Sequence, residues 1–285
     1  MTTSNEPKTD YLIASDFDKT LSFNDSGSVL CDILGIPDFE EKVNGLASTC
    51  LVHQGAELAY LLRHDPAFRC VRREHLIEAG KEVRLKNNVN RLAEMFSEKD
   101  RFPGARFPFY VISSGAADVV RSALEGIVPP NRVFGTEFLW NEDGEISSIQ
   151  RVPAGYGKVA VLEELQSRLH ISSDNTIYIG DGCSDFFVMQ HVNSHDGHTI
   201  AVSGSKTIGR IAERTVLSDD ALCVLVPILE DVLDWNPRQV RTFFATLGLS
   251  LQDWDKVQTD WVTFDELQNS SLAVGAALAG EACAG

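Results

Sequence analysis

Residues 11–20 of this chain, YLIASDFDKT, place a short apolar run directly before two carboxylates. The run is typical of a buried strand that ends in a turn, so it predicts a strand over residues 11–17. Asp16 and Asp18 stand two positions apart, and on extended backbone such side chains point the same way. Two ionised carboxylates about 4 Å apart repel by about 4 kcal/mol at an effective dielectric constant of about 20. A bound cation or a shared proton would offset this repulsion. The simpler alternative is a pair of turn and helix-cap residues in a solvated loop.

Beyond residue 103 the sequence alternates between strand and helix patterns. Strands are predicted over residues 107–113, 175–180 and 198–202, and helices over 116–125, 157–169, 206–213 and after GDGCSD at 180–185. Residues 132–140 and 145–152 flank the segment NEDG at 141–144, a hairpin signal in which glycine supplies a positive φ. Strands that alternate with helices predict an α/β fold whose parallel sheet is covered on both faces.

Residues 25–100 interrupt this alternation. Segments 38–47, 55–64 and 71–97 carry apolar residues at helical spacing with charges between them, and no strong strand pattern occurs there. The economical interpretation is a small helical cap domain inserted after the first strand. The predicted domains are a core over residues 11–24 and 101–234, a helical cap over 25–100 and a C-terminal extension over 235–285. Three of the four tryptophans lie within 235–270, which looks ordered, but its role is not assigned.

The overall charge limits the classes of partner. The chain has 285 residues, of which 41 are acidic and 25 basic, giving a formal net charge of -16. This balance excludes bulk binding to nucleic acid or to an anionic membrane, since either needs a basic surface. An anionic substrate would have to be drawn by a local positive feature, such as a metal ion or a placed lysine.

The cysteines and the two termini indicate a cytoplasmic protein. The six cysteines (31, 50, 70, 183, 223 and 283) form no CxxC pair, so scattered reduced thiols are expected. The N-terminal MTTSNEPKTD is polar and is not a signal peptide. No run approaches the length of a membrane span. The apolar tail at residues 271–285 is expected to be a packed helix or a disordered end rather than a membrane anchor.

Four positions near strand or helix ends carry groups that can do chemistry. They are Asp16 with Asp18, Ser113 with Ser114, Asp181 with Asp185, and Lys158 at the start of a helix. In an open parallel sheet, ligands bind beyond the carboxyl ends of the strands. Carboxylates grouped there suit Mg²⁺, a lysine can hold both a carboxylate and a phosphoryl oxygen, and a serine at a helix start favours an anion.

Each of these motifs also has a purely structural interpretation. Lys158 could be a surface lysine, Ser113 a helix N-cap, and GDGCSD an Asx-type turn. Cys183 lies inside that last motif without a histidine partner that the sequence identifies, so it is treated as filler rather than as a catalytic thiol. The functional interpretation gains from the combination, because two acidic pairs follow two different strands.

DFDKT at 16–20, the strand-end Ser113, Lys158 and GDGCSD at 180–185 together resemble the four motifs of the haloacid dehalogenase superfamily, in the same order. The resemblance is closest to the phosphoserine-phosphatase-like branch, which has its cap between the first and second motifs, and it covers roughly residues 11–234. It implies a Rossmann-like core that hydrolyses phosphate monoesters through an aspartyl-phosphate.

The resemblance also implies a role for each motif residue. Asp16 would be the nucleophile, and Asp18 the general acid and then base. Lys158 would hold the nucleophile and a phosphoryl oxygen. Phosphate binding would fall to Thr20, Ser113, Ser114 and Lys158, with Thr20 also orienting its loop. Mg²⁺ would be bound by Asp16, by Asp18 through its backbone carbonyl, and by Asp181, with Asp185 supporting it.

Specificity would depend on the cap. In phosphoserine phosphatases an acidic residue nine positions after the nucleophile holds the substrate amine, and Asp25 stands there; it could equally be a loop or cap residue. An arginine would be needed for the serine carboxylate, with candidates at positions 63, 69, 72, 73 and 84. The pattern SSGAAD at the strand end departs from the usual SGGF. The substrate is therefore expected to be a small phosphorylated metabolite, with a phosphoamine, an enol phosphate or a sugar phosphate open beside phosphoserine.

Three other functions use the same scaffold. A halide-displacing dehalogenase would not need the acid at Asp18. A phosphotransferase to an alcohol acceptor would use the same residues as a phosphatase. A non-enzymatic regulator would be expected to have lost Asp16, Asp18, Lys158 or Asp181, and all four are present. The oligomeric state is not predicted.

Overall fold

The structure is a computed structural model and describes residues 8–251. The chain divides into two compact units, Met1–Val240 and Arg241–Gly285. The site discussed below lies wholly in the first. Trp254, Trp261 and the apolar tail at 271–285 lie outside the described residues, as does Cys283. Within residues 8–251 no helix has both the length and the apolar character needed to cross a membrane.

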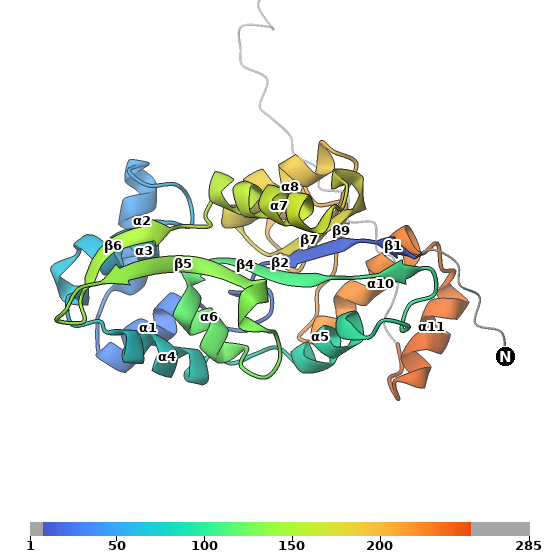
Figure 1. The fold of residues 1–285 in the computed structure, drawn as a ribbon, viewed down its shortest axis with the longest axis horizontal. Helices are drawn as coiled ribbons and strands as arrows, with labels where there is room; N and C mark the ends of the chain where they lie inside the picture. Colours follow the sequence, from blue (N-terminus) through green and yellow to red (C-terminus); the bar gives the residue numbers. More distant parts are fainter. Residues whose placement is uncertain (1–7, 252–285) are drawn as a thin grey trace, which may run out of the picture. The chain divides into compact units, whose positions relative to one another are not determined.

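The first unit is built around a seven-stranded sheet (Figure 1). Its spatial order is β6-β5-β4-β2-β7-β8-β9, and every neighbouring pair is parallel except β5 with β6. The strands are β2 (Leu12–Ser15), β4 (Phe109–Ala116), β5 (Val133–Trp140), β6 (Ile146–Arg151), β7 (Thr176–Gly180), β8 (His198–Ala201) and β9 (Arg214–Thr215). Two short strands, β1 (Thr9–Asp10) and β3 (Ala105–Arg106), pair separately. The α/β fold with a mostly parallel sheet is therefore confirmed.

Helices cover both faces of this sheet, as Figure 1 shows for α7 and α8 on one side and α5 and α6 on the other. The helices are α1 (Ser26–Leu34), α2 (Phe39–Thr49), α3 (Glu57–His64), α4 (Arg73–Glu82), α5 (Val89–Ser97), α6 (Ala117–Ala123), α7 (Tyr156–Leu169), α8 (Phe186–Asn193), α9 (Lys206–Gly209), α10 (Leu225–Pro227) and α11 (Pro237–Thr246). Short helical turns add η1 (Pro66–Phe68), η2 (Pro130–Arg132), η3 (Ser173–Asn175), η4 (Cys183–Asp185), η5 (Ala221–Val224) and η6 (Ile228–Val232).

One hydrophobic core lies between the sheet and helices α7 and α8. On β2, Leu12 and Ala14 face this core, and Tyr178 of β7 joins them. Side chains alternate between the two faces of a strand, so Asp16 continues the same face just beyond the end of β2. Asp16 therefore points to the same side of the sheet as Leu12 and Ala14, toward the start of α7, where Lys158 lies.

The expected elements are present with shifted ends. The hairpin at 132–152 is confirmed as β5 and β6, with Gly144 at a φ of 72° in its turn. The segment 71–97 is broken into α4 and α5. The helix expected at 206–213 is limited to α9, and Arg214–Thr215 adds an edge strand that was not expected.

Residues 26–97 contain helices but no named strand, as expected for an insertion after β2. Helices α1, α2 and α3 contact one another in sequence, whereas α5 contacts β4 and η5 of the core. The boundaries of the proposed cap at residues 25 and 100, and of the extension at 235, stay predictions.

Candidate active site

The predicted chemical groups meet at one edge of the sheet. Strands β4, β2 and β7 are neighbours and parallel, so the residues that follow their carboxyl ends share that edge. Asp16 follows β2, the segment 113–115 ends β4, and Asp181 follows β7. Lys158, in the first turn of α7, reaches the same place, and the structure therefore brings residues from four distant parts of the sequence together.

Lys158 is the buried cation of this site. Its ammonium Nζ lies 2.8 Å from Asp16 Oδ1 and 2.6 Å from Asp185 Oδ1, and its side chain is 0% exposed. Burial alone would lower the lysine pKa, but the carboxylates of Asp16 and Asp185 raise it above its ordinary value. The lysine therefore stays charged at neutral pH and bridges the two carboxylates.

The start of α7 depends on two glycines. Gly155 has a φ of 55°, which favours a residue without a Cβ. A Cβ on Gly157 would lie 2.3 Å from the Val152 carbonyl oxygen. The sequence GYGK thus lets the helix begin close enough to the sheet for Lys158 to reach Asp16.

Asp185 is completely buried and accepts hydrogen bonds on both oxygens. Its Oδ1 accepts from Lys158 Nζ and, at 2.7 Å, from the Tyr178 hydroxyl. Its Oδ2 accepts from the N–H groups of Asp181 and Gly182, both at 3.1 Å. A Cβ on Gly180 would lie 2.5 Å from Asp185 Cγ, so glycine is required for this approach. Asp185 therefore fixes both Lys158 and the loop that carries Asp181.

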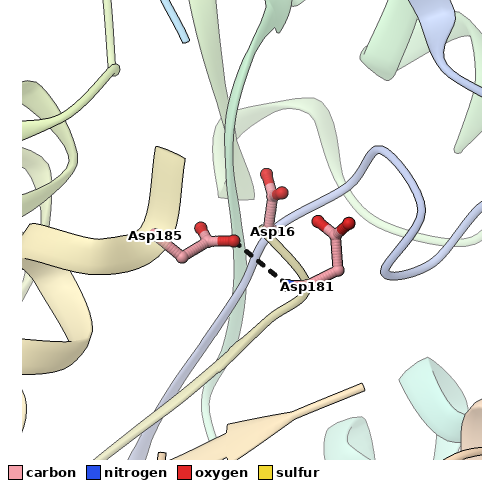
Figure 2. A group of neighbouring side chains, drawn as sticks. All are labelled: Asp16, Asp181 and Asp185. Carbon is pink, nitrogen blue, oxygen red and sulfur yellow. Dashed lines mark hydrogen bonds between the residues drawn. The ribbon is translucent and has the colours of Figure 1, made fainter. Parts of the chain in front are cut away.

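Three carboxylates form a group that could hold a metal ion. Figure 2 shows Asp16, Asp181 and Asp185 gathered together, and each offers an oxygen within 4.8 Å of the others. Burial, followed by the charge of Asp185, raises the Asp16 pKa well above its ordinary value and the Asp181 pKa to about 6. The Asp181 carboxylate accepts no hydrogen bond from residues 8–251. The three carboxylates offer closely spaced oxygen ligands, and that of Asp181 is not engaged by a hydrogen bond from these residues. This arrangement suits a cation such as Mg²⁺, which prefers oxygen ligands.

Asp18 lies beside this group, and its side chain is held by the first helix of the proposed cap. Its Oδ1 accepts from the Ser26 N–H at 2.7 Å, and its Oδ2 accepts from the Ser26 hydroxyl at 2.9 Å. Burial, and then the charge of Asp25, raise the Asp18 pKa to about 7, and the bonds from Ser26 oppose this. Ser26 was not expected from the sequence. Its hydroxyl at the start of a helical segment was the available signal.

The predicted phosphate-binding residues occupy different depths. Ser113 is fully buried, and its Oγ accepts from the Gly115 N–H at 3.0 Å. Ser114 and Gly115 line the cavity described below. A Cβ on Gly115 would lie 3.1 Å from Asp18 Oδ2 and 3.2 Å from Ser113 Oγ, so glycine keeps this space open. Thr20 is buried outside the cavity lining, and its hydroxyl has no hydrogen-bond partner among the described residues.

A cavity of about 460 Å³ opens above these residues. Its floor carries the carboxylates Asp16, Asp18 and Asp181. Its wall comes from the segment between β2 and β4, namely Asp25, Ser28, Phe39, Glu40, Val43, Asn44, Ala47, Gln54, Gly55, Glu57 and Leu58. The volume suits a small-molecule ligand.

Asp25 and Gly55 show how this wall is held. Asp25 caps helix α1 by accepting from the Ser28 N–H at 3.0 Å, and it also lines the cavity. Gly55 has a φ of 91°, and a Cβ there would lie 2.9 Å from Ser184 Cβ. The wall therefore rests directly on the loop after β7.

None of the five candidate arginines lines this cavity. Arg63 and Arg69 line a different cavity beside the β5–β6 turn. Arg72 lies 3.6 Å from Glu145, and Arg73 lies 3.0 Å from Asp118. Arg84 lies over the Phe23 ring.

Several residues in or beside the site were missed by sequence reasoning. Glu40 and Glu57 looked like ordinary helix charges, and Tyr178 like a core aromatic. Cys183, treated as filler, also lines the cavity. The five cysteines within residues 8–251 are free thiols.

No model of a known protein family and no curated protein matches the sequence. Solved structures do match the fold. A phosphoserine phosphatase with bound substrate is 18% identical with a TM-score of 0.60, and the match covers 79% of this chain and 99% of that one. A phospho-aspartyl intermediate analogue of phosphoserine phosphatase is 20% identical with a TM-score of 0.59, covering 79% and 99%.

A hydrolase of the haloacid dehalogenase family from Salmonella enterica subsp. enterica serovar Typhi is 16% identical with a TM-score of 0.63. That match covers 81% of this chain and 74% of the other. The chain therefore has the fold of these phosphatases and hydrolases. The resemblance drawn from the sequence motifs is confirmed for the fold, with its Rossmann-like parallel core.

Proposed function

We propose that this protein is a Mg²⁺-dependent phosphatase that hydrolyses a small phosphomonoester through an aspartyl-phosphate on Asp16. One observation carries the proposal: a buried lysine holds Asp16 at the edge of the sheet, next to a second acid and beneath a cavity. Phosphoserine phosphatases with the same fold support it. The substrate is proposed to be a small phosphorylated metabolite in the cytoplasm.

In the first step Asp16 attacks phosphorus. A bond forms between a carboxylate oxygen and phosphorus, and the bond between phosphorus and the ester oxygen breaks. Lys158 holds the carboxylate oriented and supplies positive charge to the phosphoryl oxygens. Ser114 and the N–H groups beside it line the cavity and are proposed to bind the remaining phosphoryl oxygens. Ser113 and Thr20, which are buried outside the lining, are proposed to hold the two phosphate-binding loops in place.

Asp18 is proposed to protonate the leaving alkoxide. Its raised pKa of about 7 means that a proton is available there near neutral pH. In the second step Asp18 accepts a proton from water as that water attacks the phosphorus of the intermediate. Inorganic phosphate is released, and Asp16 regains its free carboxylate. Ser26 orients Asp18 in both steps.

Asp16 and Asp181 are the residues proposed to hold the metal, together with the backbone carbonyl of Asp18. Bound Mg²⁺ would neutralise phosphoryl charge and restrain the attacking carboxylate. Because Asp185 already accepts four hydrogen bonds, we assign it the support of Lys158 and of the Asp181 loop rather than the main metal contact.

The test is turnover of p-nitrophenyl phosphate with Mg²⁺, together with rapid-quench detection of the phosphorylated residue. We expect hydrolysis that stops with EDTA, and label on Asp16. Asp16→Asn should abolish both, whereas Asp18→Asn should lower kcat by about 10²- to 10⁴-fold because the proton donor is lost.

Asp143→Asn is the matched control, since it makes the same change in the exposed β5–β6 turn and should leave the rate unchanged. Label on any residue other than Asp16, or full activity of Asp16→Asn, would contradict the mechanism.

A further inference from the structure

We infer that the substrate is the phosphate ester of a cationic amino alcohol that carries no carboxylate. The inference rests on the proposed phosphatase function and concerns the wall of the same cavity. It follows from which charged groups line that wall and which do not.

No arginine lines the cavity among residues 8–251. Residues 1–7 and 252–285 contain no arginine at all, so they hold none that could complete the wall. Arg73, one of the candidates, donates to Asp118 through both Nε and Nη2, at 3.2 and 3.0 Å. A bidentate partner for a substrate carboxylate is therefore missing from the described lining.

The lysines near the cavity lie close to the carboxylates of its floor. Lys158 is buried between Asp16 and Asp185. Lys19 lines the cavity next to Asp18, and its charge acts on Asp181. Lys86 also acts on Asp181, but it lines a small void behind the site. These positive charges are placed for the phosphate, and none belongs to the wall formed by residues 25–58.

The wall formed by residues 25–58 is acidic. Asp25, Glu40 and Glu57 all line it. Glu57 is only 6% exposed, and its Oε2 accepts from the Gly55 N–H at 2.8 Å, so its carboxylate is fixed in place. A substrate carboxylate in this position would face three like charges without a counter-charge. An ammonium group would be attracted by all three.

Apolar side chains approach one of these carboxylates, that of Asp25. A Cβ built on Gly27 would lie 2.6 Å from Phe39 Cζ, 3.1 Å from Leu58 Cδ2 and 3.1 Å from Asp25 Oδ1. These three side chains therefore converge on one place beside the cavity. A carboxylate next to an aromatic ring and a methyl group suits the charge and the methylene groups of an alkylammonium ion.

The test compares three esters that differ by one group each. Phosphoserine is phosphoethanolamine with an added carboxylate, and ethyl phosphate is phosphoethanolamine without the amine. With Mg²⁺ present, we expect kcat/KM for phosphoethanolamine to exceed that for either of the others by at least about tenfold, because one ion-pairing group is gained and no repelled group is present. A kcat/KM for phosphoserine that equals or exceeds that for phosphoethanolamine overturns the inference. Equal values for ethyl phosphate and phosphoethanolamine overturn it as well.

Substitutions of the wall glutamates test whether these residues cause the preference for phosphoethanolamine. Glu40→Gln and Glu57→Gln should each lower the ratio of phosphoethanolamine to ethyl phosphate several-fold. Glu41→Gln, the neighbouring exposed glutamate on α2 that does not line the cavity, is the matched control and should leave the ratio unchanged. Glu40→Arg should shift the preference toward phosphoserine. An unchanged ratio in all three wall variants contradicts the assignment.

The outcome for p-nitrophenyl phosphate separates the two proposals. If that ester is hydrolysed while phosphoethanolamine is not preferred, the inference fails and the phosphatase function stands. If no ester is hydrolysed, p-nitrophenyl phosphate included, the proposed function fails and this inference with it.

Discussion

At the residue scale, Asp185 controls the geometry on which the site depends. It joins the start of α8 to strand β7 through Tyr178, to α7 through Lys158, and to its own loop through two N–H groups. A carboxylate can accept all four hydrogen bonds, whereas an amide would present its NH₂ group to at least one of these donors. The negative charge also offsets that of Lys158, and both side chains are fully buried.

We therefore expect Asp185→Asn to lower kcat by about 10- to 100-fold, as is usual when an outer partner of a metal or catalytic group is lost. Tyr178→Phe removes one donor and keeps the charge, so its loss should be smaller. Steady-state kinetics measure both, with far-UV circular dichroism to check folding. Equal activity of folded Asp185→Asn and the parent protein would refute this role.

At the scale of elements, α4 crosses α6 at very short range. A Cβ on Gly80 would lie 2.4 Å from the Val119 carbonyl oxygen and 2.5 Å from Ser122 Cβ. The Ser122 hydroxyl also donates to the Ile77 carbonyl at 2.7 Å. Helix α4 of the proposed cap is thus packed against α6, the helix that follows β4. Strand β4 itself carries Ser113 and Ser114.

We expect Gly80→Ala to reduce the free energy of unfolding by about 1 to 3 kcal/mol, because the added methyl group must push two helices apart. Gly45→Ala is the matched control. Gly45 lies within α2 and has open space around it, so alanine there should stabilise by about 0.5 to 1 kcal/mol through its higher helix propensity. Chemical denaturation measures both, and a neutral or stabilising Gly80→Ala would show that the crossing has room to relax.

At the scale of the molecule, a net charge of -16 surrounds a site that already contains several carboxylates. Folding brings Asp16, Asp181 and Asp185 together with Lys158 as the buried cation between them, so part of their repulsion is uncompensated. A divalent ion that binds the folded state alone would relieve it. The stability of the whole chain should then depend on the metal concentration.

We expect Mg²⁺ at about 100 times its dissociation constant to stabilise the fold by about 2.7 kcal/mol, seen as a rise in Tm. KCl at equal ionic strength is the control, because it screens the overall charge without occupying the site. Asp181→Asn should remove the part of the rise that exceeds the effect of KCl. Identical shifts with both salts would count against a metal site.

The sequence by itself determined the main alternation of strands and helices up to residue 213, the hairpin at 141–144 and the identity of the motif residues. These are local properties, because side-chain periodicity and turn chemistry depend on neighbours a few positions away. The parallel sheet followed from them, since alternating strands and helices leave few other arrangements. Asp16, Lys158, Asp181 and Asp185 could be expected at one edge for the same reason.

Only the tertiary structure decided which of these groups touch. The bonds from Ser26 to Asp18 and from Tyr178 to Asp185, the acidic wall at Glu40 and Glu57, and the absence of the candidate arginines from the cavity have no local signature. Each depends on how helices pack across the sheet, where a shift of one helical turn would bring a different side chain to the same place. The motif residues could therefore be identified from the sequence, but the sign of the charge on the cavity wall was decided by how the helices pack.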